Sequence, residues 1–218
     1  MDIPAQNPFF AMFEMYHSQV QFFPYLGFGL GFAVIALFFG SYHQRSRISL
    51  LILAFLWAWN GLVLFTYEAA GLSPVLYSLQ GLLFPIQALL LIHAACAKKP
   101  PDFGIGYGLS GKAGLALMFT AIFIYPIVGN ITGHTFPAAP VFPEPCPLTI
   151  FTFGYLLSTR TLIRPVLIFI PFLWSLTGMI AVLKLGVMAD SIELITGISC
   201  TVAILLKNRK IANTARPA

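Results

Sequence analysis

The chain has 218 residues, of which 58% are hydrophobic and only 9% are charged, and its mean hydropathy is +0.86. A soluble domain of this composition could not solvate its surface, so we predict an integral membrane protein that forms one domain over residues 1–218. The net charge of +5 would suit a nucleic-acid partner, but the positions of the basic residues, described below, argue against one. The three cysteines, Cys96, Cys146 and Cys200, lie in separate segments and indicate no disulfide framework.

Apolar segments separated by polar turns predict an all-α protein with about seven transmembrane helices. Residues 1–23 are aromatic and weakly polar, which is typical of a short interfacial helix. Gly27 and Gly31 in the first span have the small-xxx-small spacing of closely packed helices. A polar tail, 207–218, is expected to fray in the cytoplasm. The spans are expected at residues 24–42, 48–69, 75–97, 113–133, 148–158, 166–185 and 191–206.

The fifth of these segments is too short to cross alone. Five prolines between His134 and Leu148 forbid regular structure there, and the apolar run that follows ends before Thr159. About a dozen residues make a helix of roughly 18 Å, against a hydrocarbon core of about 30 Å. Either the run is a half-helix approached by a proline-rich loop from the outer face, or it does not span. Irregular backbone at membrane depth must be buried in protein or line a wet cavity, so this segment is our candidate functional site.

The positions of the charges predict the orientation. If all seven segments cross, every basic residue except Lys184 falls on one side, and most acidic residues fall near the other. The positive-inside rule then predicts an outer N-terminus and a cytoplasmic C-terminus, in a bacterial inner membrane. The basic residues are topology signals beside the membrane and not a nucleic-acid surface. They are Arg45, Arg47, Lys98, Lys99, Lys112, Arg160, Arg164, Lys207, Arg209, Lys210 and Arg216.

Cys146 lies in PEPCPLT, where the short helix begins. A helix N-terminus favours a thiolate, which is a ligand for soft metal ions. His134 and Glu144 on the same outer loop could complete a metal site with Cys146. Alternatively, Cys146 is a small buried residue and the prolines shape a rigid loop. The sequence leaves both interpretations open.

Other polar side chains share helix faces and could either line a substrate pathway or hydrogen-bond between packed helices. Glu193 is the deepest of the acids near the outer ends of spans, and Asp190 could pair with Lys184 across a turn. The pathway candidates, besides the residues of the proline loop, are Thr149 and Thr152 in the short helix, Asn60 and Tyr67 in the second span, Gln80 and Gln87 in the third, and Glu193.

A motif in this region resembles that of a known family. The pattern consists of Gly133, His134, Phe136, Pro137, Cys146, Pro147, Thr149, Ile150, Phe151 and Thr152. It resembles the hallmark of an uncharacterised bacterial family of small multispan membrane proteins that bears only a domain-of-unknown-function name. The resemblance covers most of the chain and implies that His134, Cys146, Thr149 and Thr152 are the positions to test. It implies no activity.

Three functional hypotheses follow from the sequence. The first is a small permease or channel-like transporter of a small solute or ion, with its site at the start of the short helix. The second is an outer-face thiol or metal-handling protein centred on Cys146. The third is an accessory subunit of a larger membrane complex or a homo-oligomer. No HExxH, GxSxG or Walker pattern occurs, so the sequence does not favour an enzyme over the other classes, and it leaves the cofactor unknown.

Overall fold

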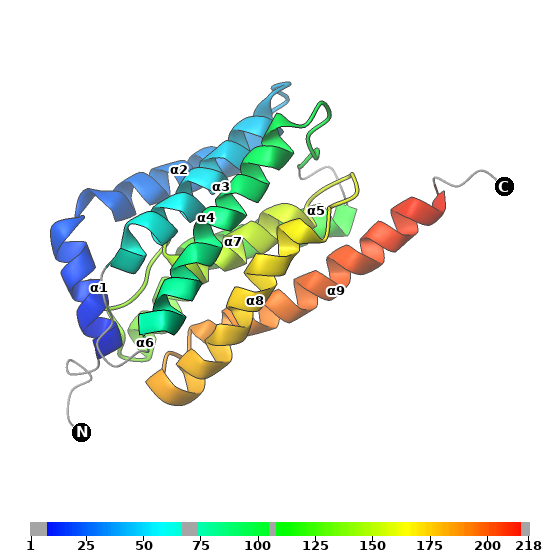
Figure 1. Cartoon of the computed structure of the whole chain (residues 1–218). Helices are drawn as coiled ribbons and strands as arrows, with labels where there is room; N and C mark the ends of the chain where they lie inside the picture. The colour runs from blue at the N-terminus through cyan, green and yellow to red at the C-terminus, as the bar shows by residue number, and fades with distance from the viewer. Residues whose placement is uncertain (1–7, 67–73, 105–107, 215–218) are drawn as a thin grey trace.

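The computed structural model describes residues 8–66, 74–104 and 108–214, and most of these residues are helical (Figure 1). Five helical segments are long and apolar enough to cross a membrane, which supports a multi-pass protein. They are α2 (Phe22–Phe39), α3 (Arg45–Leu62) with its extension to Thr66, Ser78–Cys96 of α4 (Pro74–Cys96), the run from α5 (Gly108–Phe119) through a π-helical turn to α6 (Tyr125–Ile131), and α8 (Val166–Ile180) with a π-helical turn to Leu185.

Three further helices complete the described fold. The amphipathic N-terminal segment forms α1 (Pro8–Gln19), and the predicted fifth segment forms α7 (Pro145–Leu157). The last helix, α9 (Asp190–Thr214), is 25 residues long and is more polar than the five candidate spans. It continues through residues 207–214, which we had expected to fray. At the start of this stretch, Lys207 and Asn208 hydrogen-bond to the end of α7 and to the α7–α8 connection.

The short helix α7 lies at the centre of the molecule. All of its residues are buried, and it packs against α3, α5, α8 and α9 (Figure 1). Residues 139–144, which lead into it, are also buried. The proline-rich approach is therefore folded into the protein, as the half-helix interpretation requires.

The glycines of α2 make room for this approach. A Cβ atom on Gly27 would lie 2.3 Å from the Pro143 ring, and one on Gly31 would lie 2.6 Å from Phe142. We had expected the two glycines to admit a neighbouring helix. They admit the proline loop instead, because its rings need the space that a side chain on α2 would fill. Helix α3 also holds the proline loop, because Asn60 donates a hydrogen bond to Pro143 O at 2.9 Å.

Hydrogen bonds join the α2–α3, α4–α5 and α7–α8 connections and the end of α9 at one end of the bundle. Arg47 of α3 donates to Ala95 O at 2.8 Å, and Phe103 forms a β-bridge with Thr159. The Lys207 ammonium donates to Leu157 O at 2.5 Å, where a cation is favoured by the dipole of α7. Every Lys and Arg of the described chain except Lys184 lies in these segments or within the first five residues of α3 or α5.

We predict that Gly27→Ala destabilises the protein, whereas Gly29→Ala on the same helix does not. The Gly27 Cβ would overlap Pro143, and overpacking of this kind costs about 1–3 kcal/mol. A Cβ on Gly29 meets nothing within 4 Å. Thermal unfolding in detergent should therefore show a lower Tm for Gly27→Ala only. Equal melting temperatures for the two variants would show that the loop does not depend on close contact with α2.

Candidate functional site

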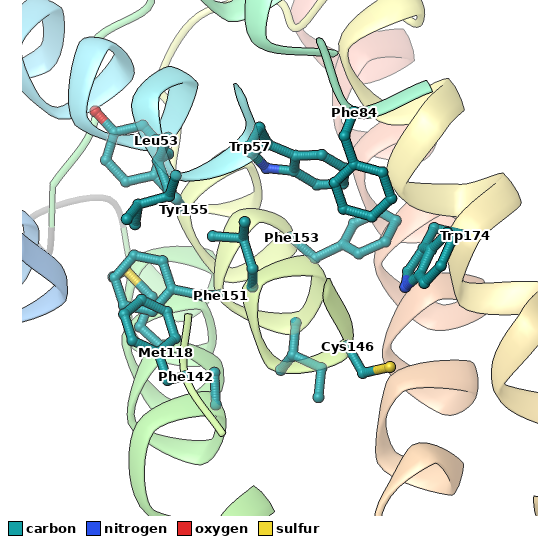
Figure 2. Packing of buried hydrophobic residues seen from close by; sticks show 14 of the residues in the cluster. Leu53, Trp57, Phe84, Met118, Phe142, Cys146, Phe151, Phe153, Tyr155 and Trp174 are labelled. Atoms are coloured by element: carbon teal, nitrogen blue, oxygen red, sulfur yellow. The ribbon is translucent and has the colours of Figure 1, made fainter. Parts of the chain in front are cut away.

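Three potential metal-ligating side chains converge at the start of α7. The Cys146 sulfur and one carboxylate oxygen each of Asp190 and Glu193 all lie within 4.8 Å of one another, and all three residues are buried. In Figure 2 the Cys146 sulfur points toward α9, which carries both acids. We refer to Cys146, Asp190 and Glu193 as the acidic cluster.

The backbone brings two helix N-termini to this cluster. Cys146 lies in the first turn of α7, and Asp190 and Glu193 lie in the first turn of α9. Gly178 of α8 allows α9 to approach, because a Cβ there would lie 2.8 Å from Asp190 O. One turn further, Gly197 of α9 sits against Ser175 of α8 in the same way. The positive ends of both helix dipoles favour negative charge at the cluster.

Tyr125 orients one of the carboxyl groups. Its hydroxyl donates to Asp190 Oδ1 at 2.5 Å, and both residues are fully buried. Tyr125 directly follows the π-helical turn Thr120–Ile124, and such turns are frequent at functional sites. Because Tyr125 binds only Oδ1, Asp190 Oδ2 remains available to another partner.

The other carboxylate oxygens of the cluster have no hydrogen bond from the described residues. Asp190 Oδ2 and both oxygens of Glu193 are buried without a donor at hydrogen-bond distance, although the Cys146 thiol lies near both acids and the Thr149 hydroxyl lies near Glu193. Neither acid forms an ion pair within the described residues, and Lys184, the expected partner of Asp190, is exposed. Burying an ionised group costs several kcal/mol, whereas a helix dipole returns about 0.3–1 kcal/mol. The cluster therefore needs either protons or a bound cation.

Two residues expected beside Cys146 lie elsewhere. Glu144 is buried against α1, where its Oε1 lies 2.7 Å from Nε2 of His17. His134 stacks on Phe10 of α1, with ring centroids 4.6 Å apart. The ligand set that converges on Cys146 thus consists of the α9 acids and differs from the set of His134 and Glu144 that the sequence suggested.

The remaining pathway candidates mostly make structural hydrogen bonds. Thr149 and Thr152 donate to carbonyls of the preceding turn, and Trp57 Nε1 donates to Thr152. Gln87 donates to Leu167 O of α8 at 3.0 Å. Asn60 binds the proline loop, and Gln80 is half-buried. Tyr67 lies outside the described residues.

Sequence reasoning missed three members of this region. Asp190 was expected to pair with Lys184, although its spacing of three residues from Glu193 places both acids on one helix face. The only feature of the sequence that marks Tyr125 is its position before a proline within an apolar run. No local feature of the sequence marks His17, because its partner Glu144 is far away in sequence.

The His17–Glu144 pair holds one proton in addition to the single N–H hydrogen of a neutral imidazole. Pro137 O can only accept, so Nδ1 of His17, 2.6 Å away, carries a hydrogen, and a second proton lies between Nε2 and Glu144. Burial alone would lower the pKa of His17, but the hydrogen bond and the charge of Glu144 outweigh it and raise that pKa. Burial also raises the pKa of Glu144, against the opposing effect of His17.

We predict that the pair makes the protein less stable as the pH rises. The folded pair keeps a proton that an unfolded histidine releases near pH 6.5, so its stabilisation is complete below about pH 6.5 and is lost as the pH passes the raised pKa of the pair. The Tm in detergent should fall from pH 6 to pH 9, and this slope should flatten in the double variant His17→Gln/Glu144→Gln. The control His43→Gln alters an exposed histidine and should keep the slope. An unchanged slope in the double variant would contradict the assignment.

Comparison with curated proteins found no match, and comparison with solved structures found none either. The model of one family, described as a family of unknown function (DUF6064), matches residues 6–216. The match includes α1, the proline loop, α7 and the acidic cluster. The chain belongs to this family, DUF6064, whose function is unknown.

Proposed function

We propose that the protein is a multi-pass membrane protein that binds a divalent transition-metal ion, with Zn²⁺ as the simplest candidate, at Cys146, Asp190 and Glu193. The observation that carries the proposal is the convergence of three buried ligand atoms within 4.8 Å, with carboxylate oxygens that receive no hydrogen bond from the described part of the chain. A bound cation would supply the missing interactions of these oxygens and balance their charge.

The types of ligand favour a transition metal over calcium or magnesium. A thiolate is a soft ligand that suits Zn²⁺, whereas Ca²⁺ and Mg²⁺ prefer oxygen ligands only. Three protein ligands with a remaining position is the arrangement of zinc sites that also bind water or a substrate. Tyr125 would act as a positioning residue, because it holds Asp190 by Oδ1 and leaves Oδ2 for the metal.

Transport of a cation is a second candidate function, and the shape of α7 favours it. Transporters place their sites at the ends of discontinuous helices that are reached by buried irregular backbone. Here α7 has 13 residues, and the buried segment 139–144 precedes it. In that case the acidic cluster would be a binding site on the pathway of the transported ion. Metal-dependent uptake into proteoliposomes would distinguish transport from a resident metal centre.

For the topology we propose seven crossings, with the N-terminus outside and the C-terminus inside a bacterial inner membrane. Two observations support this proposal: α9 is 25 residues long, and the basic residues gather at the end of the bundle that contains the α2–α3 connection. The acidic cluster then lies toward the outer side.

We predict that the purified protein binds about one Zn²⁺ per chain, measured by isothermal titration calorimetry and by elemental analysis after dialysis. Cys146→Ser, Asp190→Asn and Glu193→Gln should each weaken binding at least about 10-fold, because each removes a ligand. Tyr125→Phe should weaken it about 10- to 100-fold, the range seen when a residue that orients a ligand is removed.

Cys200→Ser is the matched control for this experiment. Cys200 is also buried and lies on α9, but it is not in the acidic cluster, so its variant should bind Zn²⁺ normally. If the wild type binds no more Zn²⁺ than the triple variant Cys146→Ser/Asp190→Asn/Glu193→Gln, the cluster is a proton-bearing acid pair and not a metal site.

We also predict the topology at two points. A fluorescent protein fused to the C-terminus should fluoresce, because it folds in the cytoplasm, and alkaline phosphatase inserted after Gly133 should be active outside. Gly133 is exposed between α6 and the buried part of the loop, so it tolerates an insertion better than residues 139–144. Cytoplasmic readings at both points would mean that an even number of crossings separates them, so that α7 or α9 does not cross.

A further inference from the structure

A second site lies at the opposite end of the fold from the acidic cluster. A cavity of about 340 Å³ opens between the last turns of α4 and the first turn of α8, bordered by the loops that precede α5 and α8. This volume is within the range of small-molecule sites, which hold ligands in about 300–1,000 Å³. Buried Ala94 of α4 and Leu167 of α8, with half-buried Leu90 of α4, form its apolar lining. Below it, the hydrogen bond from Gln87 to Leu167 O joins the two helices.

The mouth of the cavity is basic. Lys99 and Arg164 line it together with His93, and all three side chains are exposed. Arg164 Nη1 lies 3.2 Å from His93 Nε2, so the guanidinium donates one hydrogen bond to the imidazole and keeps its other donors for a ligand. The lining of this cavity contains no Asp or Glu. The electrostatic potential at the mouth therefore favours an anion.

The ligand must combine an anionic head with an apolar body. Leu162 and Val166 line the same cavity and are 51% and 45% exposed, so the apolar surface continues outward from the cavity. That surface lies on the α7–α8 connection and the start of α8, beside α4, and both α4 and α8 are long and apolar enough to cross a membrane. A soluble anion would bind the basic side chains at the mouth but would not contact the apolar lining. A neutral lipid would contact the apolar lining but would leave Lys99 and Arg164 without an anionic partner.

We infer that this cavity binds an anionic phospholipid, with the phosphate at Arg164 and Lys99 and an acyl chain along α4 and α8. Basic pockets between transmembrane helices are the usual place for such headgroups. The bound lipid would bridge α4 and α8 at the end of the molecule where the basic residues gather. This inference does not depend on the metal site, which lies at the other end of α7.

Native mass spectrometry of the delipidated protein tests the inference. The probes are phosphatidylglycerol and phosphatidylcholine with identical acyl chains, and phosphatidylglycerol should bind more tightly. The double variant Arg164→Gln/Lys99→Gln should weaken phosphatidylglycerol binding about 30-fold, because each basic side chain near an anionic lipid contributes about five-fold. Binding of phosphatidylcholine should hardly change.

The matched control is Arg209→Gln/Lys210→Gln, which removes the same charge from exposed positions on α9. An equal loss in this control would mean that diffuse charge attracts the lipid, and the cavity assignment would fail. Equal binding of the two lipids would mean that the cavity recognises only the acyl chain and not the anionic headgroup, which would also overturn the inference. A third arm adds inorganic phosphate. If phosphate displaces the lipid at matched concentration, the site is one for soluble anions.

Discussion

The fold depends on satisfying an irregular, proline-rich backbone in the interior of a membrane protein. An unpaired peptide group costs several kcal/mol there, so side chains must supply the partners that a helix would supply. His17 binds Pro137 O, Asn60 binds Pro143 O, and the Glu144 carboxylate accepts the Val141 N–H. Helices α1 and α3 are thereby fixed to the loop, and the glycines of α2 leave space for it. This arrangement determines where α7 begins, and hence where Cys146 lies.

The buried acids of the molecule differ in how many of their carboxylate oxygens have a hydrogen-bond partner. Glu144 has a histidine on one oxygen and a backbone N–H on the other, so burial leaves neither oxygen unsatisfied. Asp190 has one partner and Glu193 has none among the described residues. The fold is thus able to satisfy a buried carboxylate, and it does so where the role is structural. The unsatisfied oxygens beside Cys146 are thus not a general feature of the buried acids in this fold, and this contrast supports the proposed cation site.

Local sequence predicted the elements well and the site only in part. The lengths of the apolar runs predicted the long helices, and the prolines before Leu148 predicted a short helix with a buried approach. These two features could be predicted because each depends only on residues that are neighbours in the sequence. The partners of Cys146 depend on tertiary contacts. Glu144 is near in sequence, but it is the N-cap residue of α7 and has an extended backbone, so it faces α1 while Cys146 in the first turn faces α9. Asp190 and Glu193 reach Cys146 only because α8 and α9 fold back on α7, which no local pattern encodes.

The charges at the two ends of α7 also bear on which cation the acidic cluster suits. At the C-terminal end, the Lys207 ammonium meets the negative end of the helix dipole. At the N-terminal end, a thiolate and two carboxylates would carry three negative charges, and the dipoles of α7 and α9 each supply about half a positive charge. A monovalent cation would leave about one negative charge buried, whereas a divalent cation brings the sum close to zero. Because uncompensated buried charge is costly, this balance favours a divalent ion over Na⁺ or K⁺ and agrees with the preference of the thiolate for a transition metal.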